Sequence, residues 1–245
     1  MVLLLGGTTE AKQVAAFLEK AGCSYIYSTR TQVDFEGKGK YCFGGLNGAQ
    51  MEVLCMNEGV KMIVDACHPF AKELHQTVAS VNLNIPLIRY QRAIPIRITH
   101  PLIEYVEDYE EVLLKLEQRK FASLLALSGV QSIPLLKKYW AKHKTWFRIL
   151  DRNHSKELAS KYNFPEEFLI YGMPQEIKEE LALFWKLKPD VILTKESGLN
   201  GKSDTKIAAA IECNIQIMVL KIPMLPVGLQ VMNDLEQLQQ AISGV

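Results

Sequence analysis

The sequence predicts an α/β protein made of two lobes, each a parallel sheet flanked by helices, with a ligand cleft between them. Three observations predict it. Short apolar runs alternate with amphipathic stretches of helical length along the chain, a pattern typical of parallel sheets. A segment at 93–101, bracketed by Pro95 and Pro101, interrupts that alternation. The chain also begins with a strand, a glycine turn and a helix, the geometry of a phosphate-binding site.

The first lobe, residues 1–95, should contain four buried strands. The run Leu3-Leu4-Leu5 is typical of a strand buried on both faces. A helix follows at once, because Val14, Phe17, Leu18 and Ala21 recur on one face. Further strands are expected at 24–28, 61–65 and 85–88, further helices at 50–57 and 71–83, and an irregular connection through Gly37, Gly39, Gly44 and Gly45.

The second lobe, residues 96–245, should repeat the alternation. Apolar strands are expected at 121–127, 146–150, 168–171, 190–194 and 215–220. Helices are expected at 108–118, 133–143, 176–187, 206–213 and 234–242. The apolar face of the last helix (Leu235, Leu238 and Ile242) fits either the core or an interface with another chain.

Composition excludes several classes of function. The 245 residues are 48% hydrophobic and 22% charged with a net charge of +1, so neither nucleic acid nor a membrane is an expected partner. The five cysteines form no C-x-x-C pair, which favours reduced thiols and a cytoplasmic protein. Gly6 and Gly7 interrupt the first apolar run, so no signal peptide is expected. The His, Cys, Asp and Glu spacings predict no metal site.

The turn after the first strand is a candidate phosphate site. Gly6 and Gly7 would let the backbone approach an anion, while Thr8 and Thr9 add hydroxyl donors or a helix cap. The sequence matches neither G-x-G-x-x-G nor a P-loop. A plain tight connection between strand and helix fits this turn equally well when it is taken alone.

The second strand ends at Ser28-Thr29-Arg30, where an NAD site usually has an acidic residue for the ribose 2′-hydroxyl. Hydroxyls and an arginine suit the additional 2′-phosphate of NADP instead. A solvated loop arginine is the alternative. Because the glycine turn and Ser28/Arg30 fall in the right order within one unit, NADPH is the predicted cofactor.

Polar groups also follow the other strands, at the edge where parallel sheets bind ligands. Asp65 could hold a ligand hydroxyl or cap a helix, and His68 could be catalytic or simply packed. Cations at or near strand ends would suit a polyanionic small molecule, or are ordinary solvated charges. The remaining candidates are Arg89, Arg92, Ser128, Gln131, Lys195, Ser197, Gly198, Lys202 and Lys206.

Together these pieces resemble the precorrin-6A reductases (precorrin-6x reductases) of cobalamin biosynthesis, including those acting on cobalt-precorrin-6A. The similar stretches follow the order seen in the family and cover nearly the whole chain. The most specific are Asp-Ala-Cys-His-Pro-Phe-Ala at 65–71 and Thr-Lys-Glu-Ser-Gly at 194–198. The others lie at 3–11, 85–92, 128–131, 172–174 and 191–223.

The resemblance implies two Rossmann-like lobes, with NADPH and a tetrapyrrole between them and hydride transfer to a double bond of the macrocycle. By position it assigns the cofactor pyrophosphate to the glycine turn, and cations at the strand ends to the substrate's carboxylates. The floor of the cleft would be Asp65, His68, Pro69 and Phe70; the side facing nicotinamide or macrocycle would be Lys195, Ser197 and Gly198. His68, Lys195 or water would supply the proton.

The chain departs from the family pattern at Cys67, usually Thr, at Glu196, usually Asp, and at Leu199, usually Gly. Two other functions fit part of the pattern. An NADP-linked epimerase would share the first lobe, although a suitably placed Tyr-x-x-x-Lys is absent; a non-enzymatic carrier of NADP or tetrapyrrole would share both lobes. The sequence leaves open the cobalt content of the substrate, the oligomeric state, contacts with other enzymes of the pathway and strand exchange between the lobes.

Overall fold

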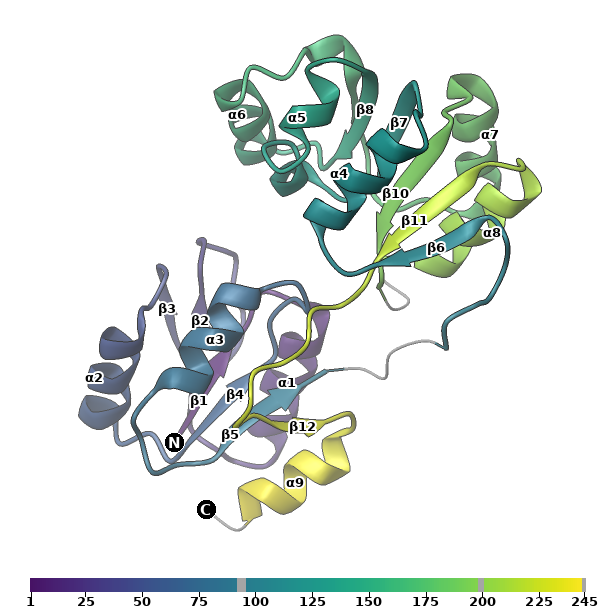
Figure 1. The fold of residues 1–245 in the computed structure, drawn as a ribbon. Helices are drawn as coiled ribbons and strands as arrows, with labels where there is room; N and C mark the ends of the chain where they lie inside the picture. Colours follow the sequence, from purple (N-terminus) through teal and green to yellow (C-terminus); the bar gives the residue numbers. More distant parts are fainter. Residues whose placement is uncertain (92–95, 198–200, 244–245) are drawn as a thin grey trace. The chain divides into compact units, whose positions relative to one another are not determined.

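A computed structural model describes residues 1–91, 96–197 and 201–243. It divides the chain into two compact units (Figure 1). Unit 1 comprises Met1–Ala93 and Pro223–Val245, and unit 2 comprises Ile94–Ile222. Each unit has a six-stranded parallel sheet flanked by helices. The predicted fold class is therefore confirmed.

Unit 1 is a sheet with helices on both faces. Helices α1 and α9 pack on one face and α2 and α3 on the other. The strands are β1 (Val2–Leu5), β2 (Tyr25–Thr29), β3 (Lys40–Phe43), β4 (Met62–Asp65), β5 (Leu87–Tyr90) and β12 (Gln230–Met232). The helices are α1 (Thr9–Lys20), α2 (Gly48–Glu58), α3 (Lys72–Ser80) and α9 (Leu235–Ser243). Leu238 of α9 is fully buried, so the apolar face of this helix serves the core of unit 1.

Unit 2 repeats this arrangement. Its strands are β6 (Ile103–Val106), β7 (Ser123–Ala126), β8 (Lys144–Ile149), β9 (Leu169–Tyr171), β10 (Val191–Lys195) and β11 (Gln216–Leu220). Its α-helices are α4 (Tyr109–Gln118), α5 (Lys137–Trp140), α6 (Asn153–Lys161), α7 (Ile177–Leu187) and α8 (Ser203–Glu212), with 3-10 turns η1 (Val130–Ser132) and η2 (Glu166–Phe168). Helices α7 and α8 pack on the sheet face formed by Leu125, Ile192 and Ile217.

The two sheets exchange their sixth strands. In unit 1, β1 to β5 lie in the order 3-2-1-4-5, and the sixth position beside β5 is taken by β12. In unit 2, β7 to β11 lie in the same order, and the sixth position beside β11 is taken by β6. Along the chain β6 follows β5 but pairs in the sheet of unit 2, and β12 follows β11 but pairs in the sheet of unit 1. The resulting order, 3-2-1-4-5-6, is common in dinucleotide-binding sheets.

This exchange corrects the predicted assignment of residues 96–245 to the second lobe. Residues from Pro223 onward belong to unit 1. Met232 pairs with Tyr90 in the first sheet, and Leu238 fills its core. The physical reason is that β12 and α9 complete an open edge of unit 1 and bury its apolar face, which no local pattern in the sequence reveals.

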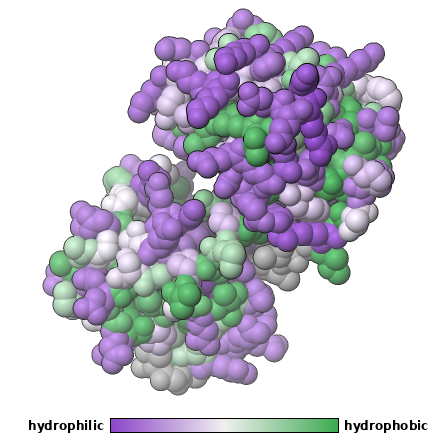
Figure 2. Space-filling model, in the orientation of Figure 1, coloured by the Kyte–Doolittle hydropathy of each residue, from purple (hydrophilic) through white to green (hydrophobic). Residues whose placement is uncertain are grey.

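Polar side chains cover much of the surface seen in Figure 2, with apolar patches between them. No helix in the described parts of the chain is long and apolar enough to cross a membrane. All five cysteines are free thiols. Within 1–91, 96–197 and 201–243, no three His, Cys, Asp or Glu side chains are grouped so as to hold a metal ion.

Candidate functional site

Each sheet has a point where the direction of its strand order reverses, and ligands of such sheets bind outside the carboxyl ends of the strands there. In unit 1 this point lies between β1 and β4, which are neighbours with Leu5 beside Asp65. In unit 2 it lies between β7 and β10, where Ala126 is beside Leu193. Four of the predicted motifs follow these four strands, so each unit has one candidate binding edge.

The glycine turn after β1 lies against Tyr27 of β2. The backbone N–H of Gly7 donates to the Tyr27 hydroxyl at 3.0 Å, and a Cβ at residue 6 would lie 2.5 Å from the ring. The ring is held in place because it stacks on Phe35 with centroids 4.5 Å apart. Gly7 has φ +103°, a conformation that favours glycine. Tyr27, which the sequence analysis did not single out, therefore shapes the turn.

Thr8 caps helix α1. Its hydroxyl accepts the N–H of Ala11 at 3.1 Å and donates to the carbonyl of Ala66 at 2.6 Å, which ties the turn after β1 to the turn after β4. Thr9 is exposed in the first turn of the helix. The helix N-terminus therefore remains a candidate anion site, with Thr9 at its surface and Thr8 as its internal brace.

Ser28 and Arg30 lie at the end of β2, the neighbour of β1. Ser28 is buried, and its carbonyl accepts the N–H of Gly6 at 2.8 Å. Arg30 is exposed. The structure thus places an exposed guanidinium one strand away from the glycine turn, as the prediction of a 2′-phosphate contact requires.

Asp65 and Arg89 form a buried network rather than a ligand-facing pair. Asp65 is fully buried, and Arg89 is 1% exposed. One carboxylate oxygen of Asp65 accepts from Arg89 at 3.0 Å, and the other lies 2.5 Å from Nδ1 of His75. Arg89 also donates to the carbonyls of Asp65 and Cys67 at 3.2 and 2.8 Å.

This network corrects two predicted roles. With both carboxylate oxygens engaged inside the fold, Asp65 neither contacts a cofactor nor caps a helix, and Arg89 is neither a substrate contact nor a solvated charge. Burial pushes the pKa of Asp65 up, but the hydrogen bond to His75 and the charge of Arg89 outweigh burial and hold that pKa below its ordinary value. The network fixes the turn at 66–71. His75, on α3, was not predicted.

The turn after β4 presents His68, Pro69 and Phe70. His68 is exposed, while Pro69 and Phe70 are half-buried. Nδ1 of His68 accepts the N–H of Phe70 at 3.2 Å, so the neutral ring carries its proton on Nε2. The Pro69 carbonyl lies 3.3 Å from Nε2 of His75. His68 is therefore an exposed ring oriented by its own turn.

In unit 2, Ser128 and Gln131 follow β7. Ser128 is buried and donates to Ser132 at 2.7 Å, which in turn donates to the Gly129 carbonyl at 2.6 Å. These bonds hold the turn, so Ser128 supports it from inside. Gln131 is exposed on the same turn and remains a candidate substrate contact.

Lys195 and Ser197 follow β10. Burial lowers the pKa of Lys195 to about 8. The backbone around Ser197 is fastened to the first residue of α8, because Ser203 Oγ donates to the Ser197 carbonyl at 2.5 Å. Two other candidates, Arg92 and Gly198, lie outside the described residues.

Lys206 is a buried cation. It is 4% exposed, and its Nζ donates to the Gly201 carbonyl at 2.7 Å. Burial lowers its pKa to about 8, with a further contribution from the charge of Arg148 that Glu180 partly offsets. Lys206 therefore stabilises the backbone at Gly201, just before α8, from the interior of unit 2. This corrects both predicted alternatives, a substrate contact and a solvated charge. Lys202 pairs with Glu176.

The depressed pKa of Lys206 gives a testable dependence on pH. Between about pH 8 and about pH 10.4 the unfolded lysine holds a proton that the folded one has lost, so the stability of unit 2 rises with pH in this window. In urea titrations at pH 8 and at pH 10, the free energy of unfolding of the wild type, measured relative to that of Lys206→Met, should rise by on the order of 2 kcal/mol. The exposed-lysine control Lys186→Met should keep the wild-type slope; equal slopes for all three proteins would refute the effect.

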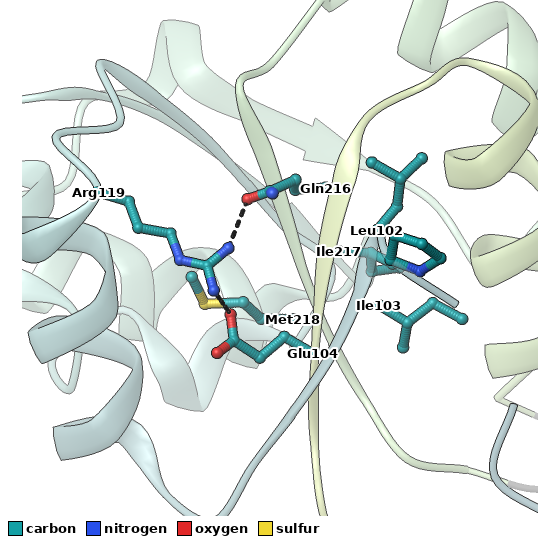
Figure 3. Close-up of a pocket in the computed structure, with 8 residues that line it drawn as sticks. Leu102, Ile103, Glu104, Arg119, Gln216, Ile217 and Met218 are labelled. Atoms are coloured by element: carbon teal, nitrogen blue, oxygen red, sulfur yellow. Dashed lines mark hydrogen bonds and ion pairs between the residues drawn. The ribbon is translucent and has the colours of Figure 1, made fainter. Parts of the chain in front are cut away.

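A small cavity of about 160 Å³ lies elsewhere in unit 2, at the amino ends of β6 and β11 (Figure 3). Arg119 bridges it, since its guanidinium contacts Glu104 at 2.7 Å and Gln216 at 2.9 Å. Because it lies at the opposite end of the strands from the turns described above, this cavity is not a candidate for their ligand.

The family model described as precorrin-6x reductase CbiJ/CobK matches residues 1–243. The chain belongs to the precorrin-6x reductase family. The resemblance drawn from the motifs at 65–71 and 194–198 is thereby confirmed.

Individual members of this family match at similar lengths. A cobalt-precorrin-6A reductase of Priestia megaterium is 29% identical, with 93% of this chain and 92% of that protein covered. A precorrin-6A reductase of Rhodococcus erythropolis is also 29% identical, with 95% and 93% covered. The solved structure of the CobK precorrin-6A reductase has a TM-score of 0.78 at 20% identity, covering 99% of this chain and 96% of that one, and so shows the same fold.

Proposed function

We propose that this protein is an NADPH-dependent reductase that converts precorrin-6A, or its cobalt form, to the corresponding 6B compound in cobalamin biosynthesis. The observation that carries the proposal is the match to the precorrin-6x reductase family over residues 1–243. Its relatives include both precorrin-6A and cobalt-precorrin-6A reductases. The geometry of both binding edges supports the same reading.

Unit 1 supplies what a dinucleotide needs. The turn at Gly6 and Gly7 lies before the N-terminus of α1, and Thr9 is exposed beside it, which suits a pyrophosphate. Arg30, one strand away, suits a 2′-phosphate. Bound NADPH would supply the hydride that reduces a double bond of the macrocycle.

Unit 2 supplies groups for a substrate with several carboxylates. Lys195 can pair with a carboxylate, and the exposed Gln131 can donate hydrogen bonds to one. A proton must also be delivered to complete the reduction. Lys195 suits this role because burial brings its pKa to about 8, close enough to neutrality for an efficient acid. The imidazolium form of His68, which is exposed on the turn after β4, is the alternative donor.

The first experiment is a fluorescence titration of the purified protein with NADPH and NADH in parallel. We expect binding of NADPH and much weaker binding of NADH. Adding precorrin-6A or its cobalt form should then consume NADPH absorbance, whereas binding of both ligands without oxidation would indicate a carrier. Turnover of a sugar nucleotide instead would favour an epimerase, and no binding of either nucleotide would contradict the cofactor assignment.

Arg30 provides a sharper test. Arg30→Ala should weaken NADPH binding by about 1–3 kcal/mol while leaving NADH nearly unaffected, because only NADPH carries the 2′-phosphate. Lys20→Ala, which removes a cation from the last turn of α1, serves as the control and should change neither constant. An equal loss for both nucleotides would refute the 2′-phosphate contact.

A cytoplasmic location, and contacts with other enzymes of the same pathway, complete this proposal. Separating cell extracts into soluble and membrane fractions tests the first. Co-purification with the enzymes that supply precorrin-6A tests the second.

A further inference from the structure

Glu196 lies directly after β10 and points away from solvent, since only 6% of its side chain is exposed. Its own N–H donates to the carbonyl of Leu220 at 2.8 Å, which joins the ends of β10 and β11. A carboxylate as buried as this one must be matched by partners inside the fold. The described partners of Glu196 come from two segments that are far apart in the sequence.

The first partner lies on the connection that enters unit 2. Arg97, three residues after that unit begins at Ile94, forms a two-pronged pair with Glu196, with distances of 2.8 and 3.1 Å. The guanidinium also lies over the ring of Tyr105, 5.5 Å from its centroid. The Tyr105 hydroxyl accepts the N–H of Ile98 at 3.0 Å, so the entering segment is held against β6.

The second partner lies on the connection that leaves unit 2. Ile222 is the last residue of this unit, and its N–H donates to Oε2 of Glu196 at 2.9 Å, the oxygen that also accepts from Nη2 of Arg97. One side chain therefore holds the entering and the leaving segments together. Both segments belong to the strand exchange, because one leads into β6 and the other toward β12.

We infer that Glu196 is a positioning residue that fastens both connections between the units to the turn carrying Lys195 and Ser197. Removing Arg97 leaves the Ile222 N–H as the remaining donor to this carboxylate among the described residues, and a buried charge without its partner forces local rearrangement. The two connections are then no longer held as a pair, although the sheet of unit 2 keeps its core. This inference does not depend on the identity of the ligand.

Amide-resolved hydrogen exchange on the full-length protein, measured by NMR, tests this role. We expect Arg97→Gln to raise exchange at the amides of Ile98 and Ile222 by about tenfold, while the amides of β10 and β11 keep wild-type rates. Glu196→Gln should raise the exchange rates of the same two amides. The matched control is Arg119→Gln, which breaks a comparably exposed arginine pair with Glu104 at the opposite end of the sheet (Figure 3) and should leave Ile98 and Ile222 unchanged.

Two results would overturn the inference. Wild-type exchange at Ile98 and Ile222 in both variants would mean that Glu196 does not hold the connections. A rise of equal size throughout β10 and β11 would mean that Glu196 stabilises unit 2 as a whole and has no specific hold on them. Neither result bears on NADPH binding, so failure of this inference is distinct from failure of the proposed function.

Discussion

Asp65→Asn is expected to destabilise unit 1 by about 3–5 kcal/mol, since it leaves the guanidinium of Arg89 buried without a counter-charge. Asparagine keeps one acceptor oxygen where aspartate has two, so Arg89 and His75, which anchors α3 to the end of β4, can no longer both be satisfied. Without these contacts, the turn that carries His68 should lose its fixed position. If the proposed cofactor site is right, nucleotide binding should therefore weaken, although the Asp65 side chain itself is fully buried.

Chemical unfolding followed by circular dichroism measures the loss. Asp34→Asn, which removes an exposed carboxylate from the same unit, should stay within about 0.5 kcal/mol of wild type. Because the folded-state pKa of Asp65 lies below its unfolded value, the stabilisation is complete above about pH 4 and is lost as pH falls. The gap between wild type and Asp65→Asn must close in acid; a gap independent of pH would argue against the ion pair.

Glu180→Gln should destabilise unit 2 by a similar amount, about 3–5 kcal/mol. Glu180 is fully buried and receives two hydrogen bonds from Arg148, each 2.8 Å long. Its loss removes the negative charge that attracts both Arg148 and Lys206, and the mutual repulsion of these two buried cations adds to the cost of burial.

Tryptophan fluorescence isolates this effect, because Trp140, Trp146 and Trp185 all belong to unit 2. Glu180→Gln should move the fluorescence transition to lower urea, and Asp65→Asn should move it far less. The neighbouring exposed residue provides the control, since Glu179→Gln keeps the same helix and the same change in net charge. A variant at 179 as unstable as the one at 180 would show that burial is not the cause.

The sequence predicts the buried strands well and the edge strands poorly. β1, β4 and β10 are apolar runs, so their periodicity alone identifies them. β3 and β12 were missed because they lie at sheet edges, are at most four residues long and are largely exposed. β6 and α6 were missed as well. Edge strands form because of the strands they pair with, which are distant in the sequence, so a local sequence pattern does not predict them.

The candidate sites show the same division. The glycine turn and Arg30 do lie at the ends of neighbouring strands, because chain order fixes which strand ends adjoin, and their roles toward a cofactor stay predictions. The roles predicted for Asp65 and Arg89 were wrong because the sequence pattern of a polar residue at the end of an apolar strand is the same in two cases. The side chain can face solvent, or it can pair with a side chain of the adjacent strand. The opposite charges of Asp65 and Arg89 at paired positions of adjacent strands were the available signal, and using it required the register of β4 and β5. Glu180 gives no such signal, because it lies on helix α7 and its partner Arg148 lies on strand β8, so no strand register pairs them.

The exchange of β6 and β12 also bears on how the polypeptide acquires its shape during synthesis. On the ribosome, the first ninety or so residues emerge without their sixth strand, and the edge of β5 must wait until β12 has been made. Unit 2 is continuous in the chain and can close its sheet as soon as β11 has emerged. The later-synthesised unit therefore has the means to mature first, and a fragment cut at residue 95 would carry a permanently open edge.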